Sequence, residues 1–290
     1  MPSFLVLGAS GMIGDFLLPL LAARNERVFA LSREQRANAG AATTIEWLRG
    51  DLCAAMPVLP QADVVLSLGP LDAFAAWFVR AAPARVDRVV AISSMSAESK
   101  RDSVDIAERE LSERLRTAEA RLLQAARGRG IGCTILRPTL IYGTGRDRSL
   151  APIARFARRW RVLPVPCGAS GLRQPVHAAD LAVACLAVLD SNSTSGKTYP
   201  VGGAERLRFD AMLARIAAGP PRLAWPLPLP LPLVRACTRL LRARVGAGAL
   251  ARLTEPLVAD NTTATRDFGY APRAFRAQDV LGYADSPGAD

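Results

Sequence analysis

Three glycines near the start of the chain have the spacing of a phosphate-binding turn. Residues 3–14 read SFLVLGASGMIG, so an apolar segment leads into the glycines and a second apolar segment leaves them. The first glycine permits a sharp turn, the second lets a pyrophosphate approach the backbone, and the third lets a helix pack closely on a strand. The free N–H groups at the helix start would hold the phosphates. This context favours a dinucleotide site over a purely structural turn. The predicted cofactor loop comprises Gly8, Ser10, Gly11, Met12, Ile13 and Gly14.

A second predicted strand, residues 27–32, ends in a sequence that bears on the choice of cofactor. An acidic residue at this point holds the ribose hydroxyl of NAD, whereas an arginine accommodates the 2′-phosphate of NADP. Here Ser32 and Arg33 end the strand, Arg36 follows closely, and Glu34 comes after the tip. We therefore expect NADP to be preferred, with NAD as the alternative. The competing interpretation makes Arg33 an ordinary solvated loop residue.

The elements that would position these residues alternate along the chain. Strands, each running into a loop, are predicted at 45–48, 62–70, 87–94 and 131–143, and a long helix at 103–127. This alternation predicts an α/β Rossmann fold, a doubly wound parallel sheet with right-handed crossovers and helices on both faces. Ligands of such sheets bind at the carboxyl ends of the strands.

The glycine spacing and several later segments resemble the short-chain dehydrogenase/reductase superfamily, in particular its extended and atypical branches, which are like the NAD-dependent epimerase/dehydratase family. The later segments are LRPTLIYG at 136–143, RQPVHAADLA at 173–182 and DFGYAPR at 267–273, so the resemblance covers nearly the whole chain. It implies that Ser94 is the catalytic hydroxyl. A helix-capping role for Ser94 is the competing interpretation. The resemblance also implies cofactor contacts from Asp51 and Leu52 near the adenine, from Leu68, Gly69 and Pro70 in a close-approach loop, and from Ser93, Pro138 and Thr139.

The resemblance breaks at the catalytic pair. The family places a tyrosine and, four residues later, a lysine on one helix face, where the lysine helps the tyrosine to move a proton. In the register set by Glu119, these positions are Leu111 and Leu115. Neither side chain transfers a proton, so tyrosine–lysine catalysis is excluded. Lys100, Glu108, Ser94 and the later tyrosines remain as candidate proton carriers. His177 is interpreted as structural rather than as a general base.

Composition excludes several other classes of function. The net charge of +11 and the pI near 10.4 would suit nucleic acid, but the basic residues are spread out and form no recognisable nucleic-acid module. One histidine and five scattered cysteines argue against a metal site and against disulfides. No apolar run is long enough to span a bilayer. The absence of a leader at the N-terminus predicts a cytoplasmic location.

The second half of the chain is expected to build a smaller lobe. We predict a cofactor domain over 1–143, with returns near 175–202, and a substrate lobe over 144–174 and 203–290. Alternating prolines at 225–233 favour an extended polyproline segment. Residues 234–253 would form an amphipathic helix. Its arginines could contact a membrane surface or an anionic substrate, although a solvated face is the ordinary explanation.

Three functions remain open. The leading hypothesis is an atypical oxidoreductase that transfers hydride between NADP(H) and a small or lipidic carbonyl or hydroxyl compound. A cofactor-bound sensor or assembly protein without catalysis is the alternative that Leu111 and Leu115 favour. A nucleotide-sugar epimerase or dehydratase is the third, weakened by the missing tyrosine. Each would be a monomer or a homodimer.

Overall fold

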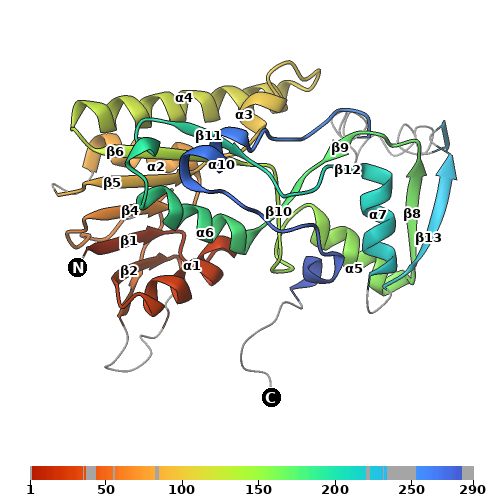
Figure 1. Cartoon of the computed structure of the whole chain (residues 1–290), viewed down its shortest axis with the longest axis horizontal. Helices are drawn as coiled ribbons and strands as arrows, with labels where there is room; N and C mark the ends of the chain where they lie inside the picture. The colour runs from red at the N-terminus through yellow and green to blue at the C-terminus, as the bar shows by residue number, and fades with distance from the viewer. Residues whose placement is uncertain are drawn as a thin grey trace.

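A parallel sheet of seven strands forms the centre of the protein (Figure 1). The computed structural model describes residues 2–34, 36, 44–54, 56–81, 85–219, 223–230, 232–233 and 253–282. The strand order is β11-β6-β5-β4-β1-β2-β3, and all neighbours are parallel. This order confirms the predicted doubly wound fold. The strands are β1 Ser3–Leu7, β2 Arg27–Ser32, β3 Ile45–Arg49, β4 Val64–Ser67, β5 Arg88–Ile92, β6 Gly132–Pro138 and β11 Thr198–Val201.

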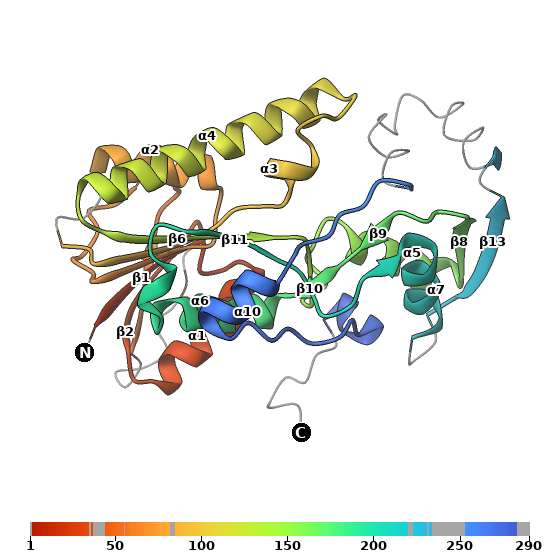
Figure 2. The same ribbon diagram turned by 45° about the horizontal axis from the view of Figure 1, so that its top comes forward.

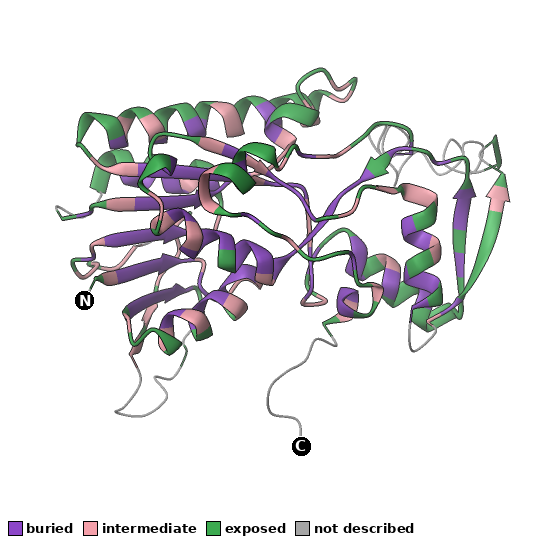
Figure 3. Ribbon diagram, in the orientation of Figure 1, coloured by how far each residue is buried: buried purple, intermediate pink, exposed green. Residues whose placement is uncertain are grey.

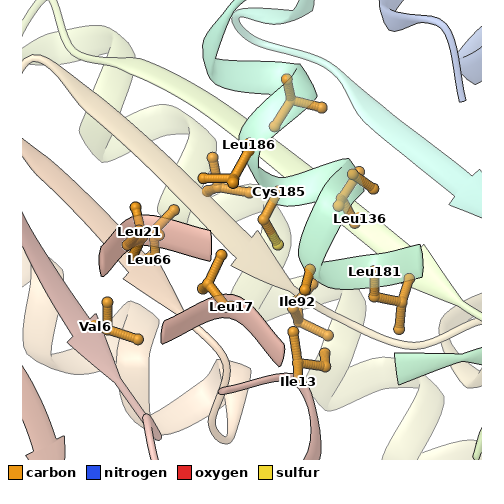
Figure 4. Packing of buried hydrophobic residues seen from close by; sticks show 14 of the residues in the cluster. Val6, Ile13, Leu17, Leu21, Leu66, Ile92, Leu136, Leu181, Cys185 and Leu186 are labelled. Atoms are coloured by element: carbon orange, nitrogen blue, oxygen red, sulfur yellow. The ribbon is translucent and has the colours of Figure 1, made fainter. Parts of the chain in front are cut away.

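Helices cover both faces of this sheet (Figures 1 and 2). On one face lie α1 (Met12–Ala23), α6 (Ala178–Leu189) and α10 (Thr262–Phe268); on the other lie α2 (Leu71–Ala81) and α4 (Ile106–Gly128). Strands buried on both faces need apolar residues at successive positions, and FLVL in β1 is such a run. Figure 4 shows the first core, where Val6 and Leu66 from the sheet lie near Leu17 of α1 and Cys185 of α6.

The remaining elements extend the molecule beyond the carboxyl ends of the strands (Figure 1). A third apolar cluster joins them and includes Tyr142, Leu163, Val165, Met212 and Phe275. Three two-stranded pairs, β7 with β10, β9 with β12 and β8 with β13, connect this region. Its elements are β7 Leu140–Tyr142, α5 Leu150–Trp160, β8 Val162–Cys167, β9 Leu172–Arg173, β10 Pro175–His177, β12 Leu207–Arg208, α7 Phe209–Ala218, β13 Trp225–Pro230 and the 3-10 helix η2 Ala277–Leu281.

The proline-rich segment is extended, as predicted, but it is a strand of a sheet rather than a free polyproline helix. Trp225–Pro230 forms β13 and pairs in parallel with Val162–Cys167. Backbone groups of alternate residues face the partner strand, and the Trp225 N–H donates to the Arg161 carbonyl at 2.9 Å. The backbone nitrogens of the alternating prolines therefore point away from the partner strand, where no N–H donor is needed. Edge strands tolerate proline at such positions. Nearly all of the helix expected at 234–253 lies outside the described residues.

One further expectation was wrong in detail. The long helix begins at Ile106 rather than at 103, because Asp105 caps it through a hydrogen bond from the Ala107 N–H to Oδ1 at 3.0 Å. Cys133 and Cys185 are buried, and burial raises the pKa of each thiol to about 12, but Cys53 and Cys167 are exposed. Within the described ranges no helix is long and apolar enough to cross a membrane, and no cluster of metal-ligating side chains occurs.

Candidate functional site

The predicted site residues follow the strands of the central sheet, and all of these strands point the same way. Because the strands are parallel, their carboxyl ends meet at one edge. The strand order reverses between β1 and β4, and the loops after these two strands lie against each other there. At that edge lie Gly8 after β1, Ser32 and Arg33 at the end of β2, Asp51 after β3, Leu68 after β4, Ser93 after β5, and Pro138 and Thr139 at the end of β6.

The glycine loop is shaped by contacts that leave no space for side chains. Gly8 has φ +76°, and a Cβ there would lie 3.0 Å from the Gly69 nitrogen. A Cβ on Gly14 would lie 1.9 Å from the Ala9 carbonyl oxygen. Gly8 therefore allows the turn at the reversal point, and Gly14 allows α1 to pack on the end of β1.

The N-terminus of α1 has the properties of an anion site. Gly11 is its N-cap and provides no side-chain cap, so the first-turn N–H groups are not claimed by a capping side chain. The Gly11 N–H itself donates to the Gly8 carbonyl at 2.9 Å. A glycine cradle that leads into an uncapped helix N-terminus fits the pyrophosphate of a dinucleotide cofactor.

Arg146, a residue that sequence reasoning missed, reaches this cradle from the loop after β7. Its guanidinium donates to the Ser10 carbonyl at 3.2 Å and pairs with the Asp15 carboxylate in the first turn of α1. The only sequence signal would have been an arginine shortly after the tyrosine–glycine segment, and Arg148 fits that description equally well. Arg146 thereby links the loop after β7 to the glycine loop and to the first turn of α1.

The end of β2 carries the features that were expected to select the cofactor. The Ser32 hydroxyl donates to the Ser10 hydroxyl at 3.3 Å and accepts from the Glu34 N–H at 3.2 Å, which ties this tip to the glycine loop. Arg33 is exposed. The Arg36 guanidinium lies over the Trp47 ring, 4.9 Å from its centroid. Two cationic groups therefore stand at this edge.

The residues expected near the adenine and in the loop after β4 have local partners. Asp51 Oδ1 accepts from the Cys53 N–H at 2.9 Å, which closes a turn. Leu52 packs against the apolar core between the sheet and helices α2 and α4. Leu68 packs against the core on the other face, between the sheet and helices α1 and α6. A Cβ on Gly69 would meet nothing within 4 Å, so this glycine leaves open space beside Gly8. The Pro70 carbonyl accepts from the Phe74 N–H at 3.0 Å and starts α2.

Ser93 uses its hydroxyl inside the protein. Ser93 Oγ donates to Glu119 Oε1 at 2.5 Å, and Arg137 Nε donates to the same oxygen at 2.8 Å. The hydrogen bond to Glu119 raises the pKa of Arg137, whose guanidinium also pairs with Glu98 at 2.8 Å. The Thr139 hydroxyl donates to the Gln174 carbonyl. These two hydroxyls hold the strand ends, and the backbone N–H groups of Ser93 and Thr139 also donate within the protein, to the Leu136 and Val201 carbonyls.

A cavity of about 470 Å³ opens beside the glycine loop and brings Met12, Ser94 and Thr139 together. Ser94 is partly buried, and its Oγ accepts from the Ser96 N–H at 3.1 Å, which leaves the hydroxyl proton to be donated. The cavity is also lined by Ser96, Ser99, Lys100, Glu108, Leu140, Ile141, Asp147, Arg148, Ser149, Leu150, Ile153, Arg173, Phe209, Glu255, Pro256 and Leu257. The other predicted site residues do not line it.

Lys100 and Glu108 form an ion pair on the wall of this cavity. Lys100 Nζ lies 3.0 Å from Glu108 Oε1, and the Ser103 hydroxyl donates to Glu108 Oε2 at 2.8 Å. Their side chains are 27% and 15% exposed, so the pair is largely shielded but accessible from the cavity. Leu111 and Leu115 do not line the cavity, and Leu115 packs against the core beneath α4.

The lone histidine lies outside the cavity. His177 Nδ1 accepts from the Ala179 N–H at 3.1 Å and so caps α6. Its ring packs edge-on against Tyr142 at 5.1 Å and against Phe16 at 5.3 Å. Burial lowers the pKa of His177 to about 4, with a further lowering by Arg273, so the ring is neutral. These contacts agree with a structural role.

Comparisons with known sequences match only parts of the chain. Residues 4–80 match a family profile that is described as "NAD dependent epimerase/dehydratase family". Two curated proteins, both called "NADH dehydrogenase [ubiquinone] 1 alpha subcomplex subunit 9, mitochondrial", are similar over short stretches. The one from Arabidopsis thaliana is 42% identical over 71 residues, and the one from Dictyostelium discoideum is 32% identical over 87 residues. These stretches are 24% and 30% of this chain, and 17% and 24% of those proteins.

Solved structures resemble the whole chain. MoeE5 in complex with UDP-glucuronic acid and NAD has a TM-score of 0.69 at 19% identity, covering 96% of each chain. UDP-glucuronic acid 4-epimerase from Bacillus cereus, in complex with UDP-glucuronic acid and NAD, has a TM-score of 0.69 at 15% identity, covering 96% of each chain. A UDP-galactose 4-epimerase has a TM-score of 0.69 at 16% identity, covering 98% of each chain. The resemblance stated from the sequence is thus confirmed for residues 4–80, which match the NAD dependent epimerase/dehydratase family, and these solved structures share the Rossmann fold of this chain.

Proposed function

We propose that this protein is an NADP(H)-dependent oxidoreductase of the epimerase-like type that acts on a carbonyl or hydroxyl group. The observation that carries the proposal is the uncapped glycine loop, whose Met12 also lines a cavity containing Ser94 and the Lys100–Glu108 pair. In this proposal residues 1–143 hold the cofactor. Residues 144–174 and 203–290 contribute the substrate side of the cavity, through Arg148 and Phe209 among others.

The cofactor would be held by the groups already described. The α1 N-terminus would receive the pyrophosphate, and Arg33 with Arg36 would receive a 2′-phosphate. When bound, the cofactor would supply or accept the hydride. The strand β2 ends at Ser32, and the first residue after it is Arg33 rather than a carboxylate that would repel a 2′-phosphate. NADP is therefore proposed over the NAD named in the solved structures.

Ser94 and Lys100 would take the place of the missing tyrosine and lysine. Ser94 Oγ would donate a hydrogen bond to the substrate oxygen, since the bond that it accepts from the Ser96 N–H leaves its hydroxyl proton available. The Lys100 ammonium would hold the proton that this oxygen gains on reduction, and the neutral amine would regain a proton from solvent. Glu108 would position the ammonium at 3.0 Å, and the Ser103 hydroxyl orients Glu108.

Calorimetric titration with NADPH and then NADH tests the cofactor part of the proposal. We expect NADPH to bind more tightly, and Arg33→Ala to weaken NADPH by about tenfold while leaving NADH unchanged. Arg101→Ala, which removes another exposed arginine, is the matched control and should change neither affinity. Equal losses for both nucleotides in Arg33→Ala would contradict the NADP preference. Failure of both to bind would contradict the site itself.

A second candidate function is a cofactor-bound sensor or assembly protein that does not catalyse. Two observations favour it: leucines occupy the tyrosine and lysine positions, and the curated relatives carry the name of a NADH dehydrogenase subunit. Oxidation of NADPH in a carbonyl-substrate screen separates the two candidates. Turnover that Lys100→Met abolishes without weakening NADPH supports the enzyme. Turnover that appears only after Leu111→Tyr with Leu115→Lys supports the sensor.

A further inference from the structure

The strands β8 and β13 form one end of the molecule, and α5 lies near them (Figures 1 and 3). This region exposes several large apolar side chains. We call it the distal face, comprising Phe156, Trp160, Val162, Trp225 and Leu227 together with Arg158, Arg159 and Arg161. The two tryptophans are 62% and 65% exposed, and Phe156 is 45% exposed. Isolated exposed apolar residues need no explanation, whereas a contiguous set indicates an interaction surface.

The register of the two strands places their exposed residues on one side. Trp225 pairs with Val162, and Leu227 with Pro164, so these four residues share a face of the β8–β13 pair. The neighbouring Leu163 lies in the third apolar cluster, so the shared face points away from that core.

Helix α5, which packs on the core side of β8, exposes two further aromatic side chains near these strands. Its Leu150, Ala154 and Ala157 are buried in the molecule, while Phe156 and Trp160 are exposed with ring centroids 6.3 Å apart. Trp160 ends the helix two residues before Val162, so its backbone lies close to the start of the exposed strand face.

The charge around this face has a single sign. The sequence contains no aspartate or glutamate from Arg148 to Ala179, nor from Ala211 to Thr254, and these two stretches contain α5, β8 and β13. Arg158, Arg159 and Arg161 are exposed on or next to α5. The acidic residue of the adjoining helix α7, Asp210, is neutralised by Arg208 at 2.7 Å.

We propose that the distal face docks on the surface of a bilayer that contains anionic phospholipids. Tryptophan rings favour the boundary between water and acyl chains, and arginines favour anionic headgroups at the same depth. The edge of β13 argues against a peptide strand as the partner. Its prolines 226, 228 and 230 turn toward that edge and offer no N–H group, so an added strand would lack donors.

Sedimentation of the full chain with vesicles tests this inference independently of the proposed cofactor chemistry. We expect binding to vesicles of phosphatidylcholine with phosphatidylglycerol, little binding to phosphatidylcholine alone, and weakening by salt. Trp160→Ala with Trp225→Ala should lower the partition coefficient at least about tenfold. Arg158→Gln with Arg159→Gln should lower it for anionic vesicles by a comparable factor.

Matched controls come from equally exposed positions elsewhere. Val104→Ala with Ile106→Ala removes two exposed apolar side chains, and Arg101→Gln with Arg121→Gln removes two exposed arginines; neither pair should change binding. The inference is overturned if the wild-type chain ignores anionic vesicles, or if the face variants bind as well as the controls. It is also overturned if the face instead mediates dimerisation or binds a nucleic-acid duplex in preference to the vesicles.

Discussion

The guanidinium of Arg146 pairs with the Asp15 carboxylate at the mouth of the glycine loop. Asp15 lies in the first turn of α1, where a carboxylate suits the helix dipole but would repel a pyrophosphate. Arg146 offsets that negative charge and also donates to the Ser10 carbonyl at 3.2 Å. Arg146, in the loop after β7, therefore neutralises a carboxylate beside the proposed phosphate site of the glycine loop.

Arg146→Ala is expected to weaken NADPH and NADH by the same factor, about tenfold. The substitution leaves Asp15 unpaired beside the proposed pyrophosphate position, and both nucleotides carry that group. Calorimetric titration of both nucleotides measures the two factors. Asp15→Asn added to Arg146→Ala should restore much of the affinity. A selective loss of NADPH would place Arg146 at the 2′-phosphate and contradict this role.

The buried Ser93–Glu119–Arg137 network offers a second prediction, on stability. Glu119→Gln leaves the Arg137 guanidinium, whose side chain is 19% exposed, with Glu98 as its remaining carboxylate. Breaking a buried pair costs roughly 3–5 kcal/mol, so we expect a loss of at least about 2 kcal/mol in the free energy of unfolding. Glu98→Gln removes the 46% exposed partner of the same arginine and should cost about 0–1 kcal/mol. Urea denaturation compares the unfolding free energies of the two variants. Equal losses would contradict the assignment of Glu119 as the more important partner of Arg137.

A third prediction separates Gly14 from the glycines that only end helices. Gly14→Ala would place a Cβ 1.9 Å from the Ala9 carbonyl oxygen, which forces α1 away from β1. We expect a loss of about 1–3 kcal/mol in unfolding free energy and weaker binding of both nucleotides. Gly128→Ala is the matched control at the end of α4, where a Cβ meets nothing within 4 Å. It should be neutral or stabilise by up to about 1 kcal/mol. A Gly14→Ala variant as stable as the control would show that the close approach is unnecessary.

The sequence predicted the sheet well because its signals are local. Apolar runs such as FLVL mark strands buried on both faces, and the glycine spacing marks the turn that follows the first strand. The carboxyl-edge position of Ser32, Ser94 and Pro138 then followed from parallel topology alone.

The partners of the side chains could not be predicted, because they join residues far apart in the chain. Arg146 meets Asp15 across 131 positions, and Ser93 gives its hydroxyl to Glu119, so neither contact leaves a local pattern. The pairing of β13 with β8 was missed for a similar reason. From the sequence alone, alternating prolines predict a free polyproline segment. Only the structure shows that the backbone groups of the residues between the prolines are hydrogen-bonded to a partner strand.

The buried histidine provides the last prediction, a dependence of stability on pH. Burial above all, and then Arg273 and Arg276, lower the pKa of His177 from 6.5 to about 4, while Asp180 opposes them. Below pH 6.5 the unfolded chain therefore binds a proton that the folded protein does not, and stability falls as the pH drops toward about 4.

His177→Asn isolates this contribution, because an asparagine oxygen can still accept the Ala179 N–H but does not titrate. Urea denaturation of both proteins at several pH values from 7 to 4 measures the difference in unfolding free energy. We expect the wild type to lose stability relative to the variant as the pH falls through this window, since only the wild type contains the titrating ring. A difference that stays constant would mean that His177 has the same pKa in the folded and unfolded states. Such a result would contradict the buried, neutral ring beside Tyr142 and Phe16.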